Sequence, residues 1–169
     1  AGDAGTAATP AATTAADTQQ ADAKFADLSK RYLDGMLALS PVSATQIGDH
    51  RYDAEVDDMS AAGRAKSLDF SKKMLAELET MDLKALSREN QVDASVLRNQ
   101  LRYDVWTIEQ LQSWAWDPQG YNATAGGALY TLVARDFAPW PERLKNATAR
   151  MEKIPAVFAA ARANLDPAR

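Results

Sequence analysis

Apolar residues recur at steps of three and four along most of the chain after residue 24, and this spacing most limits what the chain can fold into. The first such stripe consists of Phe25, Leu28, Tyr32, Met36 and Leu39. Steps of three and four place side chains on one face of an α-helix, and no segment alternates with period two for long enough to form a strand. The sequence therefore predicts an all-α fold, in which residues 24–169 form a multi-helix antiparallel bundle.

Two long helices joined by a short connection are the clearest structural prediction. The first is expected to begin at Ser60, and its apolar face consists of Phe70, Met74, Leu78 and Met81. The second is expected to begin at Ser87, and its stripe consists of Leu97, Leu101, Val105, Ile108 and Leu111. Because only residues 82–86 separate them, we expect these helices to pack as an antiparallel pair.

Proline, glycine and small polar residues mark the other expected boundaries. Ser40 is expected to cap a short helix with Pro41 in its first turn and Gly48 at its end. The turn 117–120, with sequence DPQG, is expected to stop the preceding helix near Trp116. The next helix is then expected to be capped by Asn122 or Thr124 and to run through Ala134.

The last helical region is expected to begin at Trp140-Pro141. Its first part carries four residues on one face: Leu144, Ala147, Thr148 and Met151. Pro155 is expected to interrupt the helix, since proline lacks the backbone N–H and clashes with the preceding turn. A final helix carrying Val157, Phe158, Ala161 and Leu165 is expected to follow.

Residues 1–23 are rich in Ala and Thr and contain no large apolar side chain. Such a segment cannot bury enough surface to offset its chain entropy, so we expect it to be disordered. It is either a terminus left by processing or a flexible tether between a membrane anchor and the folded domain. A tether implies an acylated cysteine before Ala1 and an exported protein, either periplasmic or a membrane-anchored lipoprotein.

Composition excludes several classes of function. The chain has a net charge of −4, with scattered basic residues, and this argues against nucleic acid as a partner. It has one histidine and no cysteine, which rules out chemistry that needs two imidazoles or a thiol within the chain. No catalytic, cofactor-binding or metal-binding residue is predicted, and this chain alone is expected to be inactive.

His50 lies between Asp49 and Asp53, and either carboxylate can orient an imidazole as a general base. Equally, a lone histidine in a turn serves as a structural hydrogen-bonding residue. Residues 53–58 resemble the start of a calcium loop, but Asp58 stands where glycine is needed and Arg64 where a bidentate glutamate is needed. A solvated acidic loop is the better interpretation.

Aromatic residues concentrate between residues 106 and 140: Trp106, Trp114, Trp116, Tyr121, Tyr130, Phe137 and Trp140. They either line a groove for a peptide or sugar or dock the 117–120 turn onto the bundle. Four carboxylates lie near them in sequence: Asp104, Glu109, Asp117 and Asp136. Their spacing pairs no two of them for hydrolysis, so none is assigned a catalytic role.

Several motifs resemble the amino-terminal part of a bacterial family known as domain of unknown function 885. They are residues 39–53 (LSPVSATQIGDHRYD), 90–94 (NQVDA) and 114–122 (WAWDPQGYN). The later Leu129-Tyr130, residues 134–139 (ARDFAP), Arg143-Leu144 and Ile154-Pro155 fit the same pattern. The resemblance covers about residues 25–169.

The resemblance implies a longer, largely helical exported protein similar to gluzincin-type zinc metallopeptidases. In such proteins a His-Glu-x-x-His helix in the carboxy-terminal half binds zinc, and the glutamate activates water. That motif is absent here, so the chain is expected to be the non-catalytic amino-terminal portion, with the carboxy-terminal catalytic half as its partner. Its helices would roof a cleft that admits short peptides.

Five residues are the candidates for facing that cleft: His50, Arg51, Tyr52, Trp116 and Tyr121. They can equally brace the two halves of the protein against each other. A competing hypothesis is a stand-alone helical binding module for a peptide or cell-wall ligand, and a third is a helical spacer without a ligand. A severed half is expected to expose a broad apolar patch, whereas a true module is expected to bury its stripes.

Overall fold

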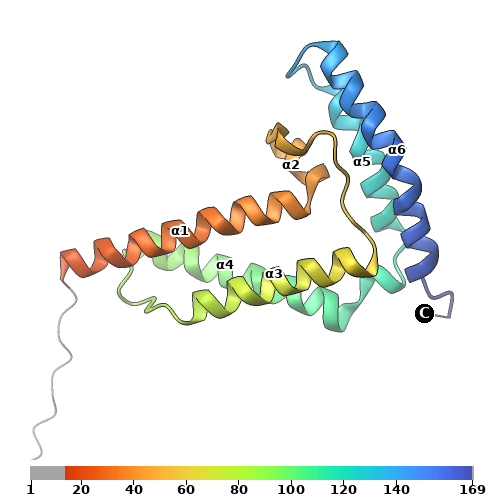
Figure 1. The fold of residues 1–169 in the computed structure, drawn as a ribbon. Coiled ribbons are helices and arrows are strands. Elements are labelled where there is room, and N and C mark those ends of the chain that lie inside the picture. Colours follow the sequence, from red (N-terminus) through yellow and green to blue (C-terminus); the bar gives the residue numbers. More distant parts are fainter. Residues whose placement is uncertain (1–13, 169) are drawn as a thin grey trace, which may run out of the picture.

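The structure, a computed structural model that describes residues 14–168, consists of helices arranged as two arms that meet at a corner (Figure 1). The long arm contains α1 (Ala15–Leu39), α3 (Ala61–Glu79) and α4 (Arg88–Trp106). The short arm is the antiparallel pair α5 (Gln119–Ala134) and α6 (Trp140–Asn164), and α2 (Pro41–Ile47) lies between the arms. The described residues contain no strand, so the predicted all-α fold is confirmed.

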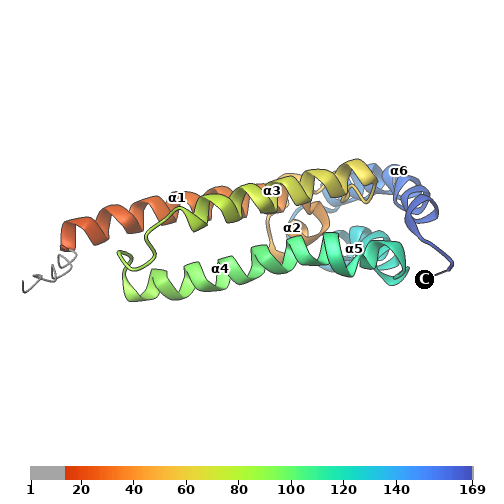
Figure 2. The ribbon, with the colours of Figure 1, turned by 90° about the horizontal axis from the view of Figure 1, so that it is seen from below.

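The long arm holds the larger core. Figure 2 shows α1, α3 and α4 running side by side, with α5 and α6 at one end. Phe25 and Leu28 of α1 pack against a cluster of buried residues from α3, α4 and their connection: Met74, Leu78, Leu86, Ala94, Leu97 and Leu101. All of these except Leu86 and Ala94 belong to the predicted stripes, whereas the last three residues of the α4 stripe, Val105, Ile108 and Leu111, are only partly buried. The antiparallel pairing of α3 and α4 is confirmed.

The amino-terminal helix begins earlier than predicted, because α1 starts at Ala15 and residues 15–23 are helical. Thr14 accepts a hydrogen bond from the backbone N–H of Asp17, and the Asp17 side chain accepts one from the Thr14 N–H. This capping box, followed by alanine-rich sequence of high helix propensity, stabilises the first turns without large apolar side chains. The part of the predicted disordered segment before Thr14 lies outside the described residues.

The predicted helix from Ser87 to Trp116 is divided. The α-helix α4 ends at Trp106, and a π-helical turn, η2 (Thr107–Leu111), continues it. Gln112 then adopts a left-handed backbone with φ of 50°, and a 3-10 turn, η3 (Ser113–Ala115), leads toward α5. π-Helical turns are rare and often lie at functional sites, so the end of α4 is a distinctive part of the fold.

Three boundary predictions are wrong. Helix α5 begins at Gln119, so neither Asn122 nor Thr124 caps it. Ser40 makes no side-chain capping bond to α2; the Asp57 carboxylate from the following loop accepts the Val42 N–H instead, at 2.9 Å. Helix α6 is continuous through Pro155. Pro155 is exposed, so water can solvate the carbonyl that its missing N–H would have bound.

The buried face of α6 also differs from expectation. Leu144 and Met151 are exposed, whereas Arg143, Ala147 and Arg150 are buried. The predicted boundaries at Ser60 and Gly48 are confirmed: Ser60 accepts the Gly63 N–H, and Gly48 ends α2 with φ of 95°. None of the helices in residues 14–168 has both the length and the apolar character that a membrane-spanning segment needs.

Candidate functional site

Arg150 of α6 is the centre of the corner between the arms and is fully buried. Its guanidinium donates to the carbonyls of Glu55 at 2.8 Å, Ala128 at 2.9 Å and Pro41 at 3.1 Å. It also donates to the Thr45 hydroxyl at 2.6 Å and to the Tyr52 carbonyl at 3.3 Å. Burial lowers the pKa of Arg150, and the nearby carboxylates of the 53–57 loop oppose that shift. One cation thus joins α2, the 50–57 loop, α5 and α6.

A chain of polar contacts leads from Arg150 to the surface at His50. The Thr45 hydroxyl donates to Oδ1 of the buried Asp53 at 2.7 Å. The other oxygen, Oδ2, lies 2.9 Å from Nδ1 of His50, in the 3-10 turn η1 (His50–Tyr52). The His50 ring stacks on Phe137 with 3.7 Å between ring centroids. Asp53 therefore orients the imidazole, and Phe137 fixes its face against the end of the short arm.

Arg51 and Tyr52 complete the turn but have different surroundings. Arg51 is exposed and pairs with Asp34 at 3.0 Å and with Asp49 at 2.6 Å, which connects the turn to α1. The Arg51 guanidinium also lies 5.4 Å from the centre of the half-buried Tyr52 ring. Of the two carboxylates that flank His50 in sequence, Asp49 forms an ion pair with Arg51, and Asp53 contacts the histidine ring.

The aromatic residues around the turn before α5 are partly packed and partly exposed to solvent. Tyr121 is buried; its hydroxyl donates to the Trp114 carbonyl at 2.7 Å and accepts from Asn164 at 3.1 Å. Trp116 is half exposed and donates to the Leu111 carbonyl at 3.0 Å. Trp116 also lines an open hollow of about 520 Å³ with Phe158, Arg162 and Leu165 near the end of α6.

The structure does not bring the two groups of candidate residues together. His50 contacts Phe137 just after the end of α5, whereas Tyr121 lies in the first turn of α5. With 16 residues, α5 is about 24 Å long at 1.5 Å per residue. A ligand that touched both groups would have to extend along most of this helix.

Carboxylates near the aromatic residues form structural contacts. Asp136 pairs with Arg143 at 2.8 Å, Glu109 pairs with Lys72, and Asp117 accepts the Gln119 N–H at 2.9 Å. In the described part of the chain, no three histidine, cysteine, aspartate or glutamate residues are grouped so that they could hold a metal ion. Within the 53–58 segment, the Asp53 carboxylate contacts Thr45 and His50, and the Asp57 carboxylate accepts the Val42 N–H.

Sequence reasoning missed the two buried arginines of α6. Arg143 donates to the carbonyls of Arg135 at 2.7 Å and Ala138 at 2.8 Å, and so satisfies backbone acceptors after the end of α5. Together with Arg150 it lies on the buried face that also contains Ala147, Val157 and Ala161. One sequence feature indicates their burial: both arginines share a helical spacing with the small residues Ala147 and Ala161.

Comparisons with known proteins agree with this architecture. The family model described as "Bacterial protein of unknown function (DUF885)" matches residues 41–169. A solved structure from Shewanella oneidensis, described as a candidate lipoprotein of unknown function, is 39% identical in sequence with a TM-score of 0.78. The match covers 84% of this chain but only 26% of that protein. Comparison with curated proteins finds no match. Since the family model matches well over half of the sequence, the chain belongs to the DUF885 family of bacterial proteins.

Proposed function

We propose that this chain is the amino-terminal, non-catalytic helical portion of an exported zinc metallopeptidase, whose full-length form hydrolyses peptide bonds. Family membership and the resemblance of its motifs support the parent class. The chain also spans about a quarter of the solved relative that it matches. The word lipoprotein in that relative's description supports export or anchoring of the present protein.

The observation that carries the proposal is an unpartnered apolar stripe on α6. It consists of Trp140, Leu144, Met151 and Phe158, all at least 38% exposed. Their spacing places them along one strip of the helix surface, which borders the buried face that contains Arg150. An exposed apolar stripe of this kind marks an interaction surface, and further helices of a longer protein would cover it.

Zinc would be held by residues outside this chain. The chain has one histidine and no cysteine, and the described residues contain no group of three His, Cys, Asp or Glu side chains that could hold a metal ion. A catalytic zinc site needs three protein ligands and an open position. The residues present therefore do not fit the metal, and we assign this chain a role in shape and access.

In that role the corner formed by α2, α5 and the 50–57 loop supports the approach to a cleft. Arg150 and Arg143 hold the helices of the corner through buried hydrogen bonds, so the surface that carries His50 and Tyr52 is rigid. Because His50 and Trp116 lie at opposite ends of α5, a cleft that includes both would run along this helix. An extended peptide fits such a path better than a folded protein does.

The test compares this chain with the product of the complete reading frame. We expect the longer protein to contain a His-Glu-x-x-His helix, to bind one zinc ion per molecule and to hydrolyse a library of quenched fluorescent peptides. The 169-residue chain is expected to bind no zinc and to cleave no peptide. A reading frame without that motif, or a zinc-free longer protein without hydrolysis, would overturn the proposal.

A stand-alone binding module is the alternative, and a pocket between α1, α3 and α4 of the long arm favours it. The two hypotheses differ in the state of the α6 stripe. A portion of a longer protein is expected to bind a hydrophobic dye and to self-associate through this stripe. A module is expected to be monodisperse and to bind little dye, because its partner is a small ligand and not a domain.

A further inference from the structure

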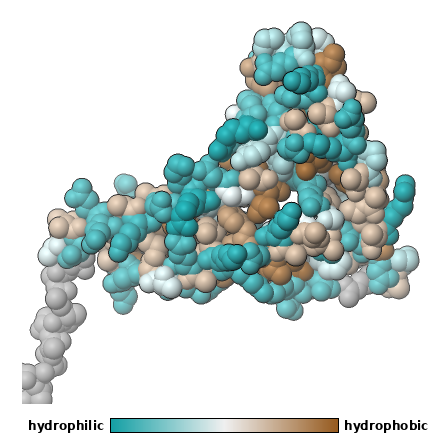
Figure 3. Space-filling model, in the orientation of Figure 1, coloured by the Kyte–Doolittle hydropathy of each residue, from teal (hydrophilic) through white to brown (hydrophobic). Residues whose placement is uncertain are grey.

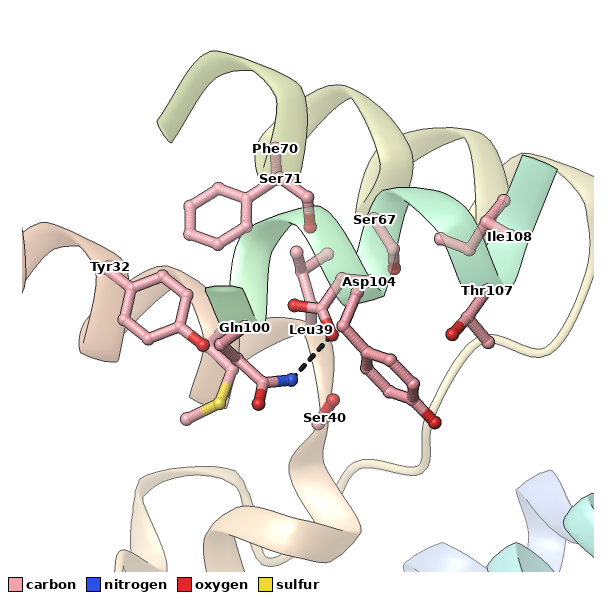
Figure 4. Close-up of a pocket in the computed structure, with 12 residues that line it drawn as sticks. Tyr32, Leu39, Ser40, Ser67, Phe70, Ser71, Gln100, Asp104, Thr107 and Ile108 are labelled. Carbon is pink, nitrogen blue, oxygen red and sulfur yellow. Dashed lines mark hydrogen bonds between the residues drawn. The ribbon is translucent and has the colours of Figure 1, made fainter. Parts of the chain in front are cut away.

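A second cavity, separate from the corner, lies between α1, α3 and α4. It has a volume of about 540 Å³, within the range of small-molecule sites. Its walls are mostly apolar, and three aromatic rings contribute to them: Tyr32, Phe70 and Tyr103. Figure 4 shows Asp104 near the middle of this pocket, between Tyr32 of α1 and Thr107 in the π-helical turn.

The Asp104 carboxylate has no cationic partner among the residues that line the pocket. None of them is lysine, arginine or histidine, and Asp104 accepts a hydrogen bond of 2.8 Å from the Gln100 amide. Two basic residues of α3 and α4 pair with other carboxylates: Lys72 with Glu109, and Arg102 with Glu79. Burial raises the pKa of Asp104, as expected for a carboxyl group without a neighbouring cation.

The wall of the pocket also contains a hydroxyl group without a hydrogen-bond partner within residues 14–168. The Thr107 Oγ1 is buried and has no hydrogen-bond partner among the described residues. An unpaired buried hydroxyl costs free energy, so the wall of the pocket is under-satisfied at this point. Thr107 begins the π-helical turn η2, so the irregular end of α4 places this hydroxyl one turn from Asp104.

These features fit one ligand chemistry. A carboxylate without a protein cation attracts a positive charge, ring faces attract ammonium and guanidinium groups, and apolar walls accept a hydrocarbon stem. We propose that this pocket binds an organic cation, an ammonium or guanidinium group on an apolar stem. The source is either the side chain of a lysine or arginine in a peptide or a free amine, and the two share the same chemistry.

The experiment titrates the full 169-residue chain, labelled with ¹⁵N, with pentylamine and follows the amide signals of Asp104 and Thr107. Pentan-1-ol, which has the same shape without the charge, is the matched control. We expect saturable shifts with pentylamine and at least about tenfold weaker binding of the alcohol, because a charged hydrogen-bonded contact is lost. An acetylated, amidated Ala-Lys-Ala peptide identifies the source: tighter binding than pentylamine assigns a peptide, and weaker binding assigns a free amine.

Two variants test the residues. Asp104→Asn keeps the acceptor for Gln100 but removes the charge, and we expect a loss of about tenfold or more in pentylamine affinity. Asp93→Asn, an exposed carboxylate on the same helix, is the control and is expected to change nothing. Ser67→Phe places a bulky ring in the cavity and is expected to weaken pentylamine binding.

Circular dichroism and thermal melting confirm that each variant is folded before the titration. Three results would overturn the proposal: equal affinities for pentanol and pentylamine, unchanged affinity in folded Asp104→Asn, or no saturable shift with the amine or the peptide. None of these readouts depends on peptidase activity, so the outcome is independent of the proposed function.

Discussion

Replacing Arg150 by methionine should be among the most destabilising single changes in this protein. The change leaves the carbonyls of Pro41, Glu55 and Ala128 without the donor that they have in the structure. The Ala128 carbonyl lies within α5 and the Pro41 carbonyl also accepts the Thr45 hydroxyl, so the Glu55 carbonyl is the acceptor left unsatisfied, at a cost of about 1–3 kcal/mol. The change also takes a nearby cation away from the buried Asp53 carboxylate, and since breaking a buried charge pair costs about 3–5 kcal/mol, we expect a net loss of that size in the free energy of unfolding.

Urea unfolding at neutral pH, followed by circular dichroism, measures this loss. Arg102→Met is the matched control, because Arg102 is exposed and pairs with Glu79 on the surface of the long arm. An exposed ion pair contributes about 0–1 kcal/mol, so the control should lose no more than that. If Arg150→Met loses less than about 1 kcal/mol, the buried arginine does not hold the corner together and the reasoning is refuted.

Three further predictions concern a close approach, a buried carboxyl group and the apolar stripe. Gly63→Ala should lower the free energy of unfolding by at least about 2 kcal/mol, because a Cβ there would lie 1.9 Å from the Asp58 carbonyl oxygen. Gly126→Ala, the control, has open space on α5 and should raise it by up to about 1 kcal/mol, and urea unfolding measures both. Burial raises the pKa of Asp57, so the folded state favours the protonated carboxyl group. The stability that the protonated group contributes is lost as pH rises through the folded-state pKa. Asp57→Asn should therefore gain stability relative to the native chain as pH rises from about 4 to 7, and an unchanged difference across that range would contradict the argument. Met151→Ser combined with Phe158→Ser should reduce binding of a hydrophobic dye with little change in melting temperature, and unchanged dye fluorescence would show that the stripe is not the apolar surface in solution.

The long arm was predictable from the sequence because its packing follows a simple rule. Leu78, Leu97 and Leu101 recur at helical spacing, and they are the buried centre of the arm. A short connection then leaves an antiparallel pair as the natural arrangement for α3 and α4. Local spacing and loop length were sufficient in this part of the molecule.

The short arm was harder to predict because its buried face includes two charged residues. Leu144 and Met151 look like a core stripe by hydrophobicity, yet they are exposed, while Arg143 and Arg150 are buried. The N–H groups of a buried arginine need acceptors. For Arg150 these include carbonyls 22 to 109 residues away, and for Arg143 they are carbonyls at and after the end of α5. The helical spacing of both arginines is visible in the sequence, but the convergence of distant acceptors on Arg150 is a tertiary property.

The candidate site was predictable in its parts but not in its arrangement. The pairing of His50 with a neighbouring aspartate follows from sequence, and Asp53 provides it. The separation of His50 from Trp116 and Tyr121 depends on the direction of α5, which aromatic content alone does not reveal. The early start of α1 follows from alanine propensity and the Thr14 cap, which outweigh the absence of large apolar residues in this segment.

The contacts of Arg150 also determine when the corner can form during synthesis. Arg150 binds the carbonyls of Pro41 and Tyr52, which precede it by 109 and 98 residues. At a translation rate of about 5–20 residues per second, the ribosome needs roughly 5–20 seconds to make the intervening chain. The helices of the long arm are complete by residue 106, so all of them are made before Arg150. The order of the chain thus supplies every partner within the long arm ahead of the residue that closes the corner.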